Sequence, residues 1–299
     1  MISAALLQGA SALLLNLALA WLLAGGLAVR WLRDTGQPWS AAAQAQLRKS
    51  MPAAALLGLL AYGGSLWAAA AAMADVPLDE AGEALSMLLS SSSYGRIGTA
   101  GCLALLLTVA LHGVGRRLPG RDWIALALLA ACAFSRAANS HAAEHGMLSL
   151  GVLVEWLHLL LICVWVGAVF AAGWLILPLA ARQAGAASAR YLGSLSDAAT
   201  LALVGIGASG LYNAWRVFGA WDKVGAGTYE TTLAVKLLLV LLAVALGGHN
   251  KFFGFPAAIA ARAGALPRVT FLLQVESLLL AGAMLAAVML AGLPPPASI

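Results

Sequence analysis

The stretch that decides the fold is LGVLVEWLHLLLICVWVGAVFAAGWLILPLA, which runs from residue 150 to residue 180. Glu155 is its only charged residue and His158 its only histidine. A helix needs about 20 mostly apolar residues to cross the roughly 30 Å hydrocarbon core of a bilayer. The stretch therefore predicts a membrane-spanning helix that carries two ionisable side chains within the bilayer.

The rest of the chain repeats this pattern. Of the 299 residues, 62% are hydrophobic and 10% are charged, and the mean hydropathy is +0.91, which excludes an ordinary soluble domain. The apolar runs are long and rich in Ala and Leu, whereas a β-barrel would show short alternating segments. We expect a single domain over residues 1–299, an all-α polytopic bundle of about eight transmembrane helices. The spans are expected near residues 3–28, 51–74, 94–114, 122–139, 150–180, 198–219, 230–250 and 269–292.

The charged residues predict the topology of this bundle. Twelve of the seventeen Lys and Arg residues fall in alternate connections: Arg30, Arg33, Arg48, Lys49, Arg116, Arg117, Arg121, Arg182, Arg190, Lys251, Arg262 and Arg268. The other connections carry Asp75, Asp79, Glu80, Glu83, Glu144 and Asp222, with Lys223 as the one clear cation. By the positive-inside rule the basic connections are cytoplasmic. Both termini are therefore expected on the periplasmic side of a bacterial inner membrane.

Several classes of partner are not expected. The net charge of +5 is explained by this topology, so no nucleic acid is expected, and no nucleotide-binding loop is present. Cys102, Cys132 and Cys163 all fall inside apolar runs and do not form a disulfide framework. The lipid bilayer is the partner that the composition predicts, and we expect no enzymatic activity.

The connection SHAAEHGM, residues 140–147, holds the first candidate metal ligands. If this piece is helical, His141 and His145 share one face, with the spacing that lets two imidazoles hold one metal ion. Met147 follows two residues later. Two solvated loop histidines are the alternative interpretation.

Glu155 and His158 form the second candidate pair. They are three residues apart, so they share one face of the predicted helix. His158 lies about two turns, or roughly 12 Å, into the bilayer. Ionisable groups at such depth mark functional sites, although a neutral histidine hydrogen-bonded to Glu155 would also explain the pair.

Other ionisable residues have simpler interpretations. Arg136, Arg216 and Lys236 lie within about two turns of the predicted outer surface, where long side chains reach the headgroups. His112 and His249 end two spans at the cytoplasmic side. They are expected at headgroup level, and they would form an exit site only if the two rings met.

The methionines indicate which metal is involved. Six of the seven lie toward the predicted outer side, and Met51 alone is cytoplasmic. Each could be ordinary core filler. Together with histidines and thiols, thioethers at a membrane entrance favour copper(I), whereas magnesium or calcium would require oxygen-rich sites.

The order of these motifs resembles the CopD/PcoD copper-resistance family. In that family a His-Ala element precedes a span that opens with a histidine and continues to Trp-x-Gly, and here these are His141-Ala142, His158 and Trp165-Val166-Gly167. The segments 207–219 and 228–252 resemble the family's late spans, and the resemblance is strongest over residues 139–292. Ser140 departs from the pattern, since a glycine often precedes the His-Ala element.

The resemblance implies an eight-span inner-membrane protein that brings copper from the periplasm to the cytoplasm, often alongside a periplasmic CopC-like copper-binding protein. Our leading hypothesis is a copper transporter that works without ATP hydrolysis and binds copper through His141, His145, Met147, Glu155 and His158. A haem-binding membrane redox protein is the first alternative, with His112 and His249 as its best ligand pair. A periplasmic copper sensor or buffer that moves nothing is the second.

Overall fold

A computed structural model describes residues 3–33, 35–113, 118–183, 189–218 and 227–293 of the chain. The regular structure in these residues is helical throughout. The long helices are α1 (Ala4–Arg33), α2 (Pro38–Ala74), α4 (Ser93–Gly113), α5 (Arg121–Ala138), α6 (Leu150–Ala171), α8 (Ala189–Phe218), α9 (Thr228–His249) and α11 (Ala265–Ala291). The short ones are η1 (Leu78–Glu80), α3 (Gly82–Ser91), η2 (His141–His145), η3 (Ala172–Ile176), α7 (Leu177–Gln183), η5 (Asn250–Gly254) and α10 (Phe255–Ile259).

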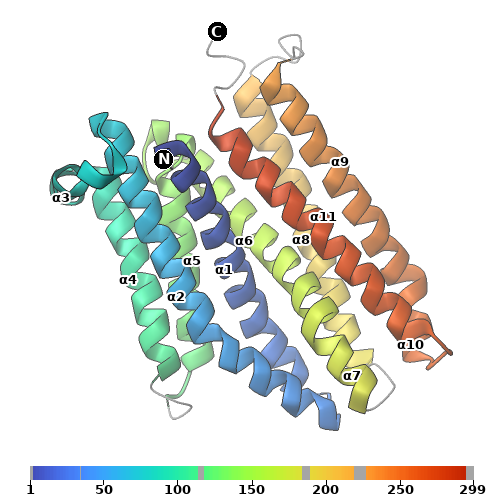
Figure 1. The fold of residues 1–299 in the computed structure, drawn as a ribbon. Coiled ribbons are helices and arrows are strands. Elements are labelled where there is room, and N and C mark those ends of the chain that lie inside the picture. Colours follow the sequence, from blue (N-terminus) through green and yellow to red (C-terminus); the bar gives the residue numbers. More distant parts are fainter. Residues whose placement is uncertain (1–2, 34, 114–117, 184–188, 219–226, 294–299) are drawn as a thin grey trace.

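Seven helices in the described part of the chain are long and apolar enough to cross a membrane. They are α1, α2, α4, α11 and three continuous helices over Leu150–Arg182, Ala189–Arg216 and Thr228–Ile259. The remaining expected span, 122–139, corresponds to α5, which is 18 residues long and contains Arg121, Asp122 and Arg136. Figure 1 shows α5 running alongside α4 and α6 within the bundle. The chain is thus an all-α, multi-pass membrane protein.

Two of the spans contain a π-helical turn. α6 continues through η3 into α7, and α9 continues through η5 into α10, so each forms one long helix with a π turn in its second half. Such turns commonly lie at functional positions. Both of these turns contact α11.

α1 lies at the centre of the bundle and packs most extensively against α2 and then against α6. Its buried face includes Leu15, Leu19 and Ala24. On α6, Gly167 lies directly against the backbone carbonyl of Ala20, where a Cβ atom would collide. A small residue at this crossing lets the two helices approach closely, which is how helices associate in a membrane that gives little hydrophobic driving force between them.

The bundle divides into two halves that share α6 (Figure 1). α1, α2, α4 and α5 lie on one side of it, whereas α8, α9 and α11 lie on the other. α1 begins and α11 ends at the same end of the bundle. Outward-facing leucines such as Leu60, Leu106 and Leu241 are 50–65% exposed, as the lipid-facing surface of a membrane protein should be. The predicted orientation, with this end in the periplasm, stays a prediction.

Candidate functional site

The paired side chains Glu155 and His158 lie in the first three turns of α6, and both are half-buried. Each is hydrogen-bonded to α8. His158 Nδ1 lies 2.8 Å from Ser209 Oγ, and Asn213 Nδ2 donates to Glu155 Oε2 at 2.8 Å. Glu155 and His158 are therefore hydrogen-bonded to α8 and not to each other, so the simpler structural explanation of the pair does not apply. α8 holds both side chains in place.

The hydrogen bond from Ser209 to the Gly205 carbonyl determines which nitrogen of His158 carries the proton. The Ser209 hydroxyl donates its own hydrogen to the backbone carbonyl of Gly205, so its oxygen accepts from the imidazole. The proton of the neutral ring is consequently on Nδ1, and Nε2 keeps a lone pair. Among the described residues no hydrogen bond to Nε2 is formed. A histidine that donates through one nitrogen and presents the other is the usual arrangement at a metal centre.

Lys236 of α9 brings a positive charge to the same place. It interacts electrostatically with the Glu155 carboxylate and with His158. The side chain is half-buried, and its expected reach to the headgroups stays a prediction. The site thus combines side chains from α6, α8 and α9, with one acidic and one basic group.

The loop residues His141 and His145 lie in η2, which is a single 3-10 segment. Residues three apart eclipse in a 3-10 helix, so His141 shares a face with Glu144 rather than with His145. His141 Nδ1 lies 3.5 Å from Glu144 Oε1, and both side chains are largely exposed. The spacing of four would give a shared face only in an α-helix. His145 and Met147 are also exposed, Met147 by 48%.

The loop is held over the N-terminal end of α6 and the C-terminal end of α8. Ser149 Oγ donates to the Ala142 carbonyl at 3.1 Å, and the side chain of Arg216 donates to the His141 carbonyl at 3.4 Å. Ser149 also caps the start of α6. The exposed donors of the loop therefore lie at the end of the bundle nearest to Glu155 and His158, although the five predicted site residues do not converge on one point.

The two histidines expected near the cytoplasmic side do not meet. His112 Nε2 of α4 lies 3.4 Å from the Met51 sulfur. His249 of α9 packs against Phe253, with 5.5 Å between the two ring centroids. Figure 1 places α4 and α9 on opposite sides of the bundle. An exit site between His112 and His249 is excluded by this arrangement, and so is a haem held between them.

Several site residues were not anticipated from the sequence. Ser209 and Asn213 are four apart on α8 and so share the face toward α6, where Glu155 and His158, three apart, share the facing side. Their polar side chains inside an apolar span were the available signal. The interaction of Lys236 with Glu155 was not predicted either. Among the described residues no three His, Cys, Asp or Glu side chains form a metal-binding group, so the site offers two donors of these kinds.

Comparisons with known families cover most of the chain. The family model described as Copper resistance protein D-like, N-terminal domain, matches residues 1–152, and the model described as Copper resistance protein D matches residues 189–290. His141, His145 and Met147 lie within the first match, whereas Glu155 and His158 lie between the two. No curated protein and no solved structure gives a significant match. Because the first match spans half of the chain and the second covers its last helices, the resemblance read from the motifs is confirmed, and the chain belongs to the CopD copper-resistance family.

Proposed function

We propose that the protein carries copper(I) across the bacterial inner membrane, from the periplasm to the cytoplasm, without ATP hydrolysis. Membership of a copper-resistance family supports the choice of metal. The observation that carries the proposal is the state of His158, a half-buried histidine whose Nδ1 proton is engaged by Ser209 and whose Nε2 lone pair is left for a ligand. Imidazole nitrogen is a suitable donor for copper.

Copper would be bound in two stages. His141, His145 and Met147 are exposed in the loop over the outer mouth, where an arriving ion is captured by imidazole and thioether donors. Glu155 and His158 then receive the ion within the bundle. The Glu155 carboxylate offsets the positive charge of the ion, which would otherwise be strongly disfavoured at this depth. Lys236 neutralises that carboxylate while the site is empty.

The direction follows from the membrane potential. An inside-negative potential of 100 mV favours inward movement of one positive charge by about 2.3 kcal/mol. A periplasmic CopC-like protein, the partner that the family resemblance implies, would deliver copper to the loop and keep the external supply high. The membrane potential and the high external supply of copper together replace ATP as the source of free energy.

Influx into liposomes tests this function. The purified protein is reconstituted with an impermeant copper(I) indicator inside, and wild type is compared with His158→Ala. His249→Ala is the matched control, since this histidine also lies in a spanning helix but packs against Phe253. We expect influx to be lost in the first variant and kept in the second. Normal influx through His158→Ala would disprove the intramembrane site.

A copper sensor or buffer is the second candidate function, favoured by the exposure of the loop donors. Replacing both His141 and His145 by Ala separates the two. Transport predicts that influx falls in the double variant. A wild-type protein that binds copper at this loop, yet gives no influx in intact liposomes of known orientation, would support the sensor and rule out transport.

A further inference from the structure

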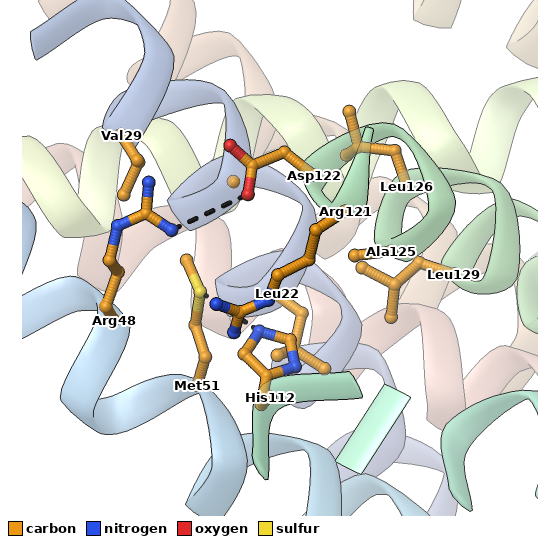
Figure 2. Close-up of a pocket in the computed structure, with 11 residues that line it drawn as sticks. Leu22, Val29, Arg48, Met51, His112, Arg121, Asp122, Ala125, Leu126 and Leu129 are labelled. Atoms are coloured by element: carbon orange, nitrogen blue, oxygen red, sulfur yellow. Dashed lines mark hydrogen bonds and ion pairs between the residues drawn. The ribbon is translucent and has the colours of Figure 1, made fainter. Parts of the chain in front are cut away.

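The predicted cytoplasmic end of the bundle contains a pocket in the N-terminal half, away from the Glu155 and His158 site. Its volume is about 20 Å³, enough for one water molecule or one ion. It is lined by Leu22, Gly26, Val29, Arg48, Met51, His112, Arg121, Asp122, Ala125, Leu126 and Leu129. Figure 2 shows Met51 and His112 together in this pocket, with the guanidinium groups of Arg48 and Arg121 around them.

The His112 ring presents a lone pair to the Met51 sulfur. Its Nδ1 lies 2.7 Å from the backbone carbonyl of Thr108, which can only accept, so Nδ1 carries the proton of the neutral ring. Nε2 is then an acceptor, and it faces the Met51 sulfur at 3.4 Å. A thioether has lone pairs and no hydrogen to donate. Two acceptors consequently face each other at contact distance, which is unfavourable unless something electron-deficient lies between them.

A second proton on the ring would resolve this contact, but the surrounding charges oppose it. The guanidinium groups of Arg48 and Arg121 lie beside the ring, and Asp122 is the one acidic residue among those that line the pocket. Asp122 is already paired with Arg33 and with Arg48, the latter at 3.5 Å. An imidazolium is therefore poorly supported here. A soft cation that forms bonds with both lone pairs resolves the contact through covalent character rather than charge alone.

We propose that Met51 and His112 form a second copper(I) site. Imidazole and thioether are among the donors that suit copper(I), a d10 ion that is satisfied by two or three ligands. Metal–nitrogen and metal–sulfur bonds of roughly 2.0 and 2.3 Å that meet at about 120° separate the two donor atoms by ~3.7 Å. The observed 3.4 Å is close to this separation, so a small rotation of the flexible methionine admits the ion.

The choice of copper rests on the proposed function, but the site itself is separate. Met51 and His112 belong to α2 and α4, whereas Glu155 and His158 belong to α6 and are held by α8. The arginines around the pocket weaken the binding of any cation, so this site holds copper less tightly than a site beside a free carboxylate. Weak binding at the cytoplasmic end suits release.

Anaerobic titration of the purified full-length protein with copper(I), in competition with a chromogenic copper(I) chelator, tests the site. Met51→Leu and His112→Gln should each bind one copper(I) ion fewer per protein than the wild type. The double variant should lose no more copper(I) than either single variant. Met284→Leu is the control, because Met284 and Met51 are both 5% exposed. His158→Ala should lose a different equivalent, so failure of the transport site and failure of this site are distinguishable.

Carbon-13 labelling of the methionine methyl groups gives a second readout, which observes copper binding in the wild-type protein itself. Copper(I) should shift the Met51 methyl resonance of the wild-type protein, identified as the signal missing from Met51→Leu. The shift should be absent in His112→Gln. A Met51 resonance that stays unmoved at saturating copper, or full stoichiometry in folded Met51→Leu and His112→Gln, would overturn the proposal.

Discussion

Ser209 decides which nitrogen of His158 carries the proton, although it has no role as a ligand. Ser209→Ala removes the acceptor for Nδ1–H, so the ring loses both its fixed orientation and its preferred tautomer. We expect copper affinity to fall by about 10–100-fold, the usual effect of losing such a partner. Ser209→Thr keeps the hydroxyl and should restore most of the affinity. Competition titration with a copper(I) chelator measures both, and unchanged binding in Ser209→Ala would contradict the assigned role.

Lys236 opposes the binding of a cation at the same site. Lys236→Met keeps the length of the side chain but removes the charge that acts on Glu155 and His158. Because like charges repel strongly in a poorly solvated site, copper affinity should rise by roughly tenfold, or about 1.4 kcal/mol. Lys251→Met is the control, since Lys251 donates to Thr200 at 2.6 Å near the other end of the bundle. Weaker copper binding in Lys236→Met would show that the lysine positions Glu155 instead.

At the scale of the elements, the crossing of α1 and α6 depends on Gly167. A Cβ atom at this position would lie 2.7 Å from the Ala24 Cβ and would collide with the Ala20 carbonyl. Gly167→Ala should therefore destabilise the folded protein by about 1–3 kcal/mol. Gly63→Ala in α2 is the matched control, because nothing lies within 4 Å of its added Cβ. Thermal unfolding in detergent distinguishes them, and equal melting temperatures would show that α1 and α6 separate without strain.

The spans were predictable from the sequence, but their ends were not. The runs that predicted spans at 51–74 and 198–219 belong to α2 and α8, which begin earlier, at Pro38 and Ala189. Hydropathy reports the part of a helix that lies in lipid, whereas a helix continues into water wherever its backbone stays hydrogen-bonded. The basic residues Arg48 and Lys49 therefore lie on a helix rather than in a loop.

The site was predictable in part, and the limit was pairing between helices. Glu155 and His158 were visible because ionisable residues are rare inside apolar runs. Their partners Ser209 and Asn213 are ordinary polar residues, and nothing in their spacing says which helix they face. The contact between Met51 and His112 joins residues 61 positions apart, which only the packing of α2 against α4 brings together. The sequence also did not predict that His141–His145 forms a 3-10 segment instead of an α-helical turn.

For the whole molecule, the orientation in the membrane is open to a direct test. A single cysteine at His145, in a chain whose native cysteines are replaced, should react with an impermeant maleimide added from the periplasmic side. A cysteine at Arg262 should react only after the membrane is permeabilised, since the basic connections are predicted to face the cytoplasm. Reaction of Arg262→Cys in intact cells, without reaction of His145→Cys, would place the His141–Met147 loop on the cytoplasmic side and rule it out as the entrance for periplasmic copper.

The π turns at Ala172–Ile176 and Asn250–Gly254 also bear on how this family can vary in evolution. Each π turn accommodates about one residue more than an α-helical turn, and one residue rotates everything after it by about 100° about the helix axis. Phe255 and Ala258, which follow η5 in α10, are buried. A relative that lacks the extra residue must turn a different face of this helix toward α11. A homologue without the π turn should therefore be one residue shorter at this place. An alignment that leaves out this gap would pair lipid-facing positions of one protein with core positions of the other.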